Sequence, residues 1–287
     1  MRTKGAKLMG ESSWVFKTLW EDVGKLGNIR IKTRKAERVI VREFKGEKYL
    51  ASVGSFWDKE SMKTYHSIIL EPKAADPNFV LSLINLVRED ENLPLRESLS
   101  IPDDAAATWV EKNGFPKVDI FDLDSDSFYR LPFEYFYTHT GALYLLFKLW
   151  LALLDNDEIR IYRFLKYFSE QFGIQVREEN LYLILQHYIN IGMSNSKMQL
   201  DFEEGKPVIH LETDNLFSAA YFQLAQLMTK PKDYESWKHL KTCPIEEGGC
   251  GNIFWGHGNR KYCPDCRRST AAYRRKKRKE RASSEKG

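Results

Sequence analysis

The sequence contains no hydrophobic run long enough to cross a membrane. The longest apolar stretch, Ala142 to Leu154, is interrupted by Lys148 and is shorter than the ~20 residues that a membrane-spanning helix requires. Residues 1–10 combine basic and small residues and lack the apolar segment of a secretory signal. These absences predict a cytoplasmic protein without a membrane partner, in which residues 142–154 belong to a buried helix.

Familiar catalytic motifs are also missing from the chain. There is no glycine-rich phosphate-binding loop and no Gly-x-Ser-x-Gly sequence. The triplet His210-Leu211-Glu212 resembles part of the zinc deaminase motif, but Tyr262 stands where that motif has proline. That interpretation would also leave Cys243 and Cys250 without a role. We therefore predict no catalytic residues, and an enzyme site in the helical part of the chain stays open as an alternative.

Cysteine is scarce, and all four cysteines lie within 24 residues, at Cys243, Cys250, Cys263 and Cys266. Clustered thiols in a chain without a secretory signal favour a metal site over disulfides. Four thiolates close every position of a tetrahedral Zn²⁺ ion, so we predict one structural zinc ion bound by these residues. The six-residue gap after Cys243 is longer than usual and predicts a bulged loop. His257 is interpreted as a surface or phosphate-facing residue.

Charge is divided unevenly along the chain. Residues 260–287 hold twelve of the 44 basic and three of the 40 acidic residues, so this segment carries +9 and the rest carries −5. Such a concentrated basic end predicts a polyanionic partner, and its position beside the cysteines favours nucleic acid. The predicted nucleic-acid contacts are Arg260, Lys261, Arg267, Arg268, Arg274, Arg275, Lys276, Lys277, Arg278 and Lys279.

Hydrophobic periodicity predicts an α+β protein with a small N-terminal antiparallel sheet, a central helical body and a C-terminal zinc finger that carries a basic helix. The predicted parts are, in order, a small α+β subdomain at 1–72, a mainly helical body at 73–240 with one hairpin at 196–212, the zinc finger with its basic helix at 241–281, and a disordered tail at 282–287.

Three central helices are predicted in the most hydrophobic part of the body, at 132–154, 157–172 and 178–192. Breaks at Asp155-Asn156 and at Gly173 separate them. The predicted core face of the second helix consists of Ile159, Tyr162, Phe164, Leu165 and Phe168. A further amphipathic helix is predicted at 12–26.

The C-terminal third of the chain resembles bacterial proteins with a zinc finger of the CGNR type, some of which have an N-terminal region described as an ABATE-like stress-sensing domain. The matching features are an apolar helix at 215–228, two cysteines followed by an aromatic residue, the Lys261-Tyr262-Cys263 sequence, a second cysteine pair and an arginine-rich segment. Arg267-Arg268 stands where the family has Gly-Asn-Arg, which is the pattern of a sister group.

This resemblance implies that Cys243, Cys250, Cys263 and Cys266 bind zinc in a treble-clef-like finger and that residues 267–278 form the basic helix. It further implies a bacterial DNA-binding transcription regulator, associated with the nucleoid, for which DNA is favoured over RNA. An RNA-binding or phage-defence-associated protein stays open, because charge alone does not distinguish the two nucleic acids. A homodimer formed through the helical body is a further open possibility.

Overall fold

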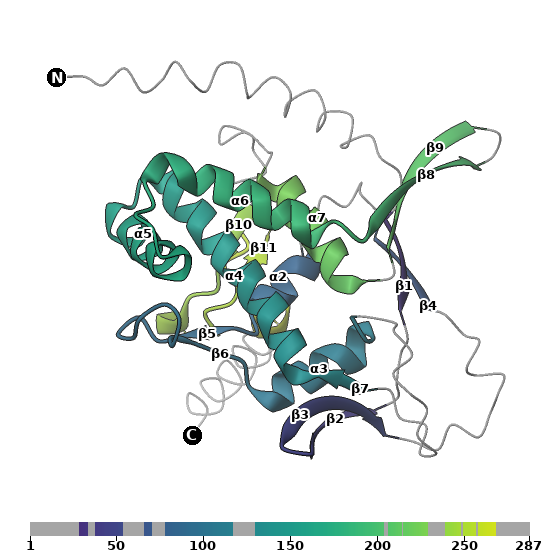
Figure 1. Ribbon diagram of the computed structural model, residues 1–287. Helices are drawn as coiled ribbons and strands as arrows, with labels where there is room; N and C mark the ends of the chain where they lie inside the picture. Colours follow the sequence, from purple (N-terminus) through teal and green to yellow (C-terminus); the bar gives the residue numbers. More distant parts are fainter. Residues whose placement is uncertain are drawn as a thin grey trace, which may run out of the picture.

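The computed structural model describes residues 29–33, 38–53, 66–70, 78–116, 130–203, 206–213, 215–228, 239–247, 249–256 and 258–267. Within these residues, a group of packed helices is flanked by several small sheets (Figure 1). The helices are α2 (Asn78–Ile84), α3 (Asp103–Asn113), α4 (Phe133–Asp155), α5 (Glu158–Phe172), α6 (Glu178–Gly192) and α7 (Leu216–Met228). The predicted helix at 12–26 lies outside the described residues.

Local sequence signals place the ends of the central helices. Asn156 adopts a left-handed conformation with φ of 51°, and it ends α4. The Asp157 carboxylate accepts a hydrogen bond from the Arg160 backbone N–H at 3.1 Å and so caps the start of α5. Gly173 ends α5 with φ of 64°. These stops explain why the three predicted central helices are confirmed within about one residue at each end.

The core is built around α4 and α7. Helix α7 buries eleven of its residues, so neighbouring elements surround it on nearly all sides. It packs against α2, α4 and α6. The Gln223 side chain of α7 accepts a hydrogen bond from the Val80 backbone N–H at 3.1 Å, which satisfies a buried donor at the start of α2.

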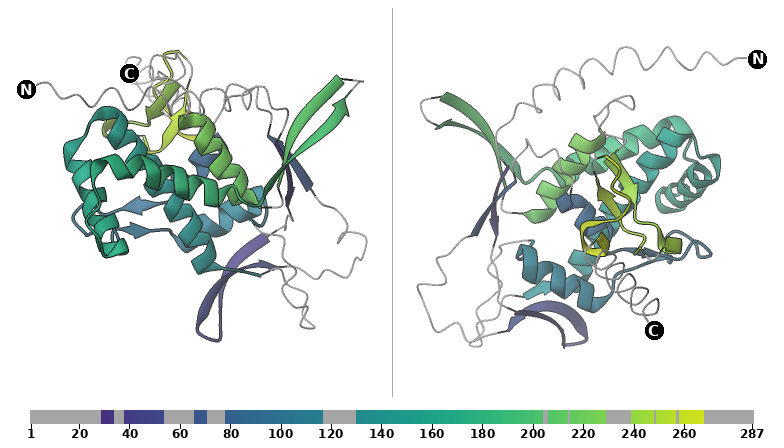
Figure 2. Two further views of the ribbon diagram at one scale, coloured as in Figure 1. Left: turned by 45° about the horizontal axis from the view of Figure 1, so that its top comes forward. Right: turned by 180° about the vertical axis from the view of Figure 1, so that it is seen from behind.

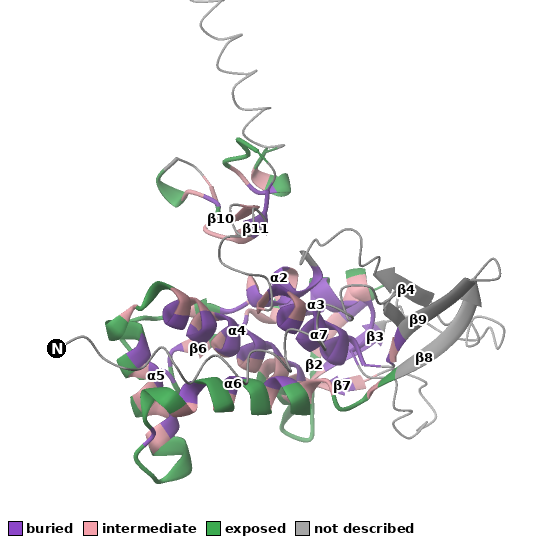
Figure 3. Cartoon of the chain, turned by 90° about the horizontal axis from the view of Figure 1, so that it is seen from above, coloured by how far each residue is buried: buried purple, intermediate pink, exposed green. Residues whose placement is uncertain are grey.

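The predicted core face of α5 is wrong at two positions. Ile161, Phe164 and Phe168 are buried and face the core, whereas Ile159 and Tyr162 are 79% and 68% exposed. The spacing 161, 164, 168 is itself a helical stripe, and it lies on a different side of the helix from 159 and 162. Figure 3 shows that the outer sides of α5 and α6 are exposed along much of their length.

The strands pair across long sequence separations. The strands are β1 (Ile29–Thr33), β2 (Arg38–Phe44), β3 (Glu47–Val53), β4 (His66–Leu70), β5 (Arg88–Glu89), β6 (Leu99–Ser100), β7 (Arg130–Pro132), β8 (Ser196–Glu203), β9 (Lys206–Thr213), β10 (Leu240–Thr242) and β11 (Ile253–Trp255). One sheet has the order β4-β1-β9-β8, with β1 parallel to β9, and another has the order β2-β3-β7. Strands from residues 29–70 therefore complete their sheets with strands from the helical part of the chain.

The described helices offer no membrane-spanning candidate, since none of them is both long enough and apolar enough to cross a bilayer.

Candidate metal centre

The hairpin of β10 and β11 has one face toward the helical body and one toward the cysteines. Trp255 is buried in the main core, and Leu240 and Ile253 pack against that core. Phe254, which lies between Ile253 and Trp255, is buried in a separate small cluster with Cys243 and Cys263. Because successive strand residues point to opposite faces, this short strand connects the two hydrophobic clusters.

Helix α2 holds the hairpin through one side chain. The Asn85 amide donates a hydrogen bond to the Ile253 backbone oxygen at 2.7 Å, and its oxygen accepts one from the Ile253 N–H at 2.8 Å. The side chain thus pairs with strand β11 much as a neighbouring strand would. Seen from behind, the hairpin lies over α2 (Figure 2, right).

We expect Asn85→Ala to loosen the hairpin from the body. The substitution leaves the Ile253 N–H and C=O groups without partners at a half-buried interface, which costs about 1–3 kcal/mol. Hydrogen exchange should show faster exchange in residues 240–256, while α4 remains protected. Asn92→Ala is the matched control, since Asn92 is exposed and bonds only within its own turn. Equal exchange in the two variants would contradict this role of Asn85.

The four thiols converge to the size of a single tetrahedral site. Their sulfur atoms all lie within 4.8 Å of one another, and the Cys250 and Cys263 sulfurs are 3.6 Å apart. A tetrahedral ion with metal–sulfur distances of ~2.3 Å separates its ligand sulfurs by about 3.8 Å. A disulfide needs ~2.05 Å, and all four cysteines are free. The donor set therefore fits one metal ion, and its four-thiolate composition suits zinc.

The long gap between the first two cysteines is filled by an extra turn. Residues Ile245–Glu247 form a 3₁₀ helix between the two ligand positions. The chain then turns back to lie beside Cys243. Two backbone hydrogen bonds fix this turn: the Cys243 N–H donates to the Asn252 oxygen at 2.9 Å, and the Gly251 N–H donates to the Cys243 oxygen at 3.0 Å. Gly251 has φ of 78°, a conformation that glycine adopts without strain.

The second cysteine pair sits at the start of a helical turn. Pro264 is the first residue of the turn at 264–267, where its missing N–H has no cost. The Cys266 N–H donates to the Cys263 sulfur at 3.4 Å, and the Arg267 N–H donates to the Cys263 oxygen at 2.9 Å. This arrangement places both sulfurs beside those of the first pair.

The thiols have unequal acidities. Burial opposes ionisation of Cys243, but hydrogen bonds from the backbone N–H groups of Cys263 and Cys250 and from neighbouring thiols lower its pKa overall. The hydrogen bond with Cys250, followed by burial, raises the pKa of Cys266 to about 12. Four thiolates this close repel one another, so a divalent cation is the group that would allow all of them to ionise.

Three of the predicted nucleic-acid contacts lie in the described region. Arg260, Lys261 and Arg267 are exposed beside the cysteine cluster. Lys241 was not predicted, and its ammonium donates to the backbone oxygens of Gly258 and, at 3.0 Å, Arg260, so it holds the loop that carries Arg260. The remaining predicted contacts lie outside the described residues, namely Arg268, Arg274, Arg275, Lys276, Lys277, Arg278 and Lys279.

Gly249→Ala is expected to disturb the metal site directly. An added Cβ would lie 2.5 Å from the Pro244 oxygen and 2.6 Å from the Cys243 sulfur, and neither atom belongs to the far end of a flexible side chain. The first cysteine loop must therefore shift, and we expect metal affinity to fall by at least tenfold in a competition titration with a chromophoric chelator. Gly141→Ala is the control, because Gly141 lies in α4, outside the cysteine module, and its Cβ would meet only Leu99 Cδ1 at an ordinary 3.8 Å. Unchanged affinity in Gly249→Ala would show that the loop differs from this geometry.

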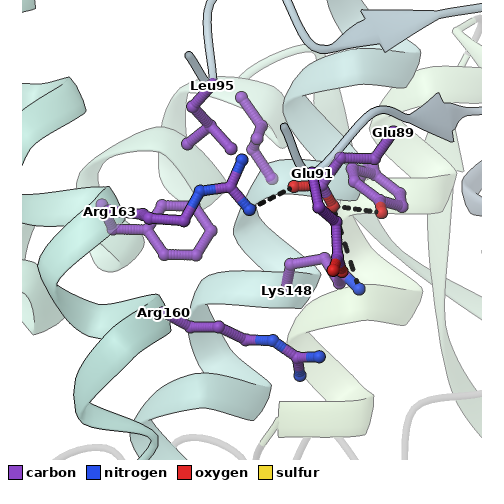
Figure 4. A pocket seen from close by; sticks show the side chains of 9 residues that line it. Glu89, Glu91, Leu95, Lys148, Arg160 and Arg163 are labelled. Atoms are coloured by element: carbon purple, nitrogen blue, oxygen red, sulfur yellow. Dashed lines mark hydrogen bonds and ion pairs between the residues drawn. The ribbon is translucent and has the colours of Figure 1, made fainter. Parts of the chain in front are cut away.

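A second polar cluster lies in the helical body and bears on the enzyme alternative. The space between α4, α5 and the segment after β5 is about 310 Å³, open solvent at its mouth included, and Glu89 is among the residues that line it (Figure 4). The Glu89 carboxylate accepts hydrogen bonds from the Tyr144 hydroxyl at 2.7 Å and from Arg163 at 3.0 Å, and the Lys148 ammonium is 3.9 Å away. Burial lowers the pKa of Lys148.

These polar groups interact mainly with one another. Each Glu89 oxygen already has a donor, and the side chain is only 8% exposed. Arg163 also donates to the Leu93 oxygen at 3.2 Å. The cluster therefore ties β5 and its following loop to α4 and α5, which is a structural role.

Comparison of the chain with known protein families, with curated proteins and with solved structures finds no match. The resemblance to CGNR-type zinc fingers therefore stays a prediction from the C-terminal motif. The functional assignment depends on the geometry of the cysteine cluster and on the charge of the segment that follows it.

Proposed function

We propose that this protein binds nucleic acid and acts as a bacterial DNA-binding transcription regulator, in which a zinc-loaded, treble-clef-like module presents a basic helix to phosphates. The observation that carries the proposal is the convergence of four thiols immediately before the basic segment. Cys243, Cys250, Cys263 and Cys266 would bind the ion. The ion supplies a fixed, closed cross-link and takes no part in a reaction.

The electrostatics of the module support a polyanionic partner. Arg260, Lys261 and Arg267 are exposed and lie within three residues of Cys263 or Cys266 in the sequence, and the segment at 260–287 carries +9. The rest of the chain carries −5 overall, so the net electrostatic attraction for phosphates is strongest at this end. Because the hairpin is fixed to α2 through Asn85, the module has a defined orientation on the body.

The proposal is tested by a salt titration of binding to a labelled 20-base-pair duplex, followed by fluorescence anisotropy. The variant replaces Lys276, Lys277 and Lys279 with glutamine. Loss of three phosphate contacts should make the log–log salt slope less steep by about 2.7. The matched control replaces three exposed lysines outside the module, Lys112, Lys166 and Lys197, with glutamine and should bind like the wild type.

Two outcomes would reject this function in whole or in part. Absence of salt-dependent binding by metal-loaded wild-type protein would reject nucleic-acid binding. Competition in which structured RNA displaces the duplex at tenfold lower concentration would favour the RNA-binding alternative. Metal content is measured on the same samples, since less than half an ion per chain would contradict the structural site.

A further inference from the structure

The sheet β2-β3-β7 has two chemically different faces. Its register pairs Arg42 with Tyr49, Phe44 with Glu47, and Ala51 with both Ile40 and Arg130. Residues directly opposite one another share a face, and alternate residues of a strand point to opposite faces. One face therefore carries Arg38, Ile40, Arg42, Phe44, Glu47, Tyr49, Ala51 and Arg130.

The other face packs on the helices. Val39, Leu50 and Leu131 lie on it and are at most 5% exposed. The Lys48 ammonium, also on this side, is 2.9 Å from the Asp103 carboxylate at the start of α3. In Figure 1 the curved sheet lies with α3 on one side, and its second face turns away from the described helices. We call this second face the open face.

The open face combines cations with aromatic rings. Arg38, Arg42 and Phe44 are exposed, with Phe44 at 43%. The Arg130 guanidinium lies 4.7 Å from the centre of the Phe44 ring, and the Lys45 ammonium lies 5.3 Å from it. Arg130 on β7 and Phe44 on β2 lie on the same face, so this contact crosses the intervening strand β3.

Acidic residues are few on the strand positions that form the described open face. Glu47 is the only acidic residue that the register places on the open face, and its carboxylate accepts a hydrogen bond from the Tyr49 hydroxyl at 2.6 Å. That bond, together with burial and the nearby negative charge, raises the pKa of Tyr49, so the phenol stays protonated near neutral pH. The face thus offers three arginines and the turn lysine around two aromatic side chains.

We propose that the open face binds single-stranded nucleic acid, with Arg38 and Arg42 on phosphates and a base stacked on Phe44. Arginine beside an exposed aromatic ring suits this ligand, since every base has a π-face and every nucleotide a phosphate. A duplex hides its base faces and would leave no base to stack on the Phe44 ring. The proposal concerns a surface separate from the cysteine module and does not depend on the function proposed above.

Arg38 and Arg42 lie four residues apart on one strand, about 13 Å along it. A bound strand would therefore follow β2 and contact at least two phosphates. We expect Phe44 to be close to one base between or beside these contacts. We therefore expect the arginines to determine the salt dependence of binding and the Phe44 ring to determine the affinity at fixed salt.

The test is binding of full-length, metal-loaded protein to a fluorescent 12-nucleotide oligo(dT). Arg38→Gln/Arg42→Gln should make the salt slope less steep by about 1.4, which is the value for two contacts to a single strand. Phe44→Ala should weaken binding about tenfold at fixed salt with little change in slope. Lys112→Gln/Lys166→Gln removes two exposed charges elsewhere and should match the wild type.

Crosslinking identifies the surface directly. An oligo(dT) that carries one 5-iodouracil should crosslink to the peptide containing Phe44 or Tyr49 after irradiation. The measurements are repeated with Lys276, Lys277 and Lys279 changed to glutamine, so that the sheet is tested separately from the basic segment. Wild-type affinity in both sheet variants, crosslinks confined to other peptides, or an equal loss of affinity for a 12-base-pair duplex would overturn the proposal.

Discussion

Cys263→Ser is expected to abolish metal binding and to release the β10–β11 hairpin from the body. Cys263 is 4% exposed and packs with Cys243 and Phe254, and its sulfur also accepts the Cys266 N–H. Structural zinc contributes ~10–16 kcal/mol of binding free energy in small zinc peptides. Removal of one of the four ligands should cause loss of the ion. The hydrophobic cluster around Phe254 is too small to hold the loops together by itself.

The consequence extends into the main core. Trp255 is buried in the main core, and Leu240 packs against that core. Release of the hairpin therefore exposes a large aromatic side chain and breaks the hydrogen bonds between Asn85 and Ile253. Burial of these apolar groups contributes about 3–5 kcal/mol. At ~2 °C per kcal/mol for a chain of this size, the melting temperature should fall by roughly 6–10 °C.

Metal analysis and differential scanning calorimetry measure the two effects together. Asp265→Asn is the matched control, because Asp265 lies between Cys263 and Cys266 but is exposed and is not a predicted ligand. It should keep one ion per chain and the wild-type melting temperature. Retention of a full ion by Cys263→Ser would show that the cysteines do not form one four-ligand site. A strong chelator added to the wild type should reproduce the loss of stability.

The sequence predicted the metal centre better than it predicted the sheets. Spacing of Cys243, Cys250, Cys263 and Cys266 is a local signal, and local turns then bring the sulfurs together. Pairing of β1 with β9 joins residues about 180 positions apart, and no local pattern encodes a partner at that distance. The hairpin predicted at 196–212 is confirmed as β8 and β9, whereas the pairing of β1 with β9 and of β3 with β7 was not predicted.

Single side chains with structural roles were also missed. Nothing in the sequence around Asn85 indicates that its side chain bonds the backbone of a strand. That role depends on the position of Ile253, which lies far away in the sequence. Part of the open face could be predicted from the sequence, because Arg38, Arg42 and Phe44 occupy alternate positions of one strand and so share a face. Arg130 comes from a strand about 90 residues later and completes the cation–π contact. For α5, two apolar stripes overlap in the sequence, and the packing against α4 selects the one at 161, 164 and 168.

The largest stability effect in the helical body is expected for Gly192→Ala. A Cβ on Gly192 would lie 2.2–2.5 Å from three ring carbons of Tyr221. Tyr221 is 4% exposed on α7, the most enclosed helix, so its ring cannot move aside without disturbing the core. Insertion of a methyl group into such packing costs 1–3 kcal/mol and can cost more, and we expect at least about 3 kcal/mol here because the clash involves ring carbons.

Gly141→Ala is the matched control for the same chemical change in a buried helix. Its Cβ would meet only Leu99 Cδ1, at an ordinary 3.8 Å, so the gain in helix propensity of up to ~1 kcal/mol should dominate. Urea denaturation measures both free energies of unfolding. In a Tyr221→Ala background, Gly192→Ala should become nearly neutral, since the clashing ring is gone. Equal costs of Gly192→Ala in the two backgrounds would mean that α6 does not approach α7 through this glycine, because the penalty would then be independent of the ring.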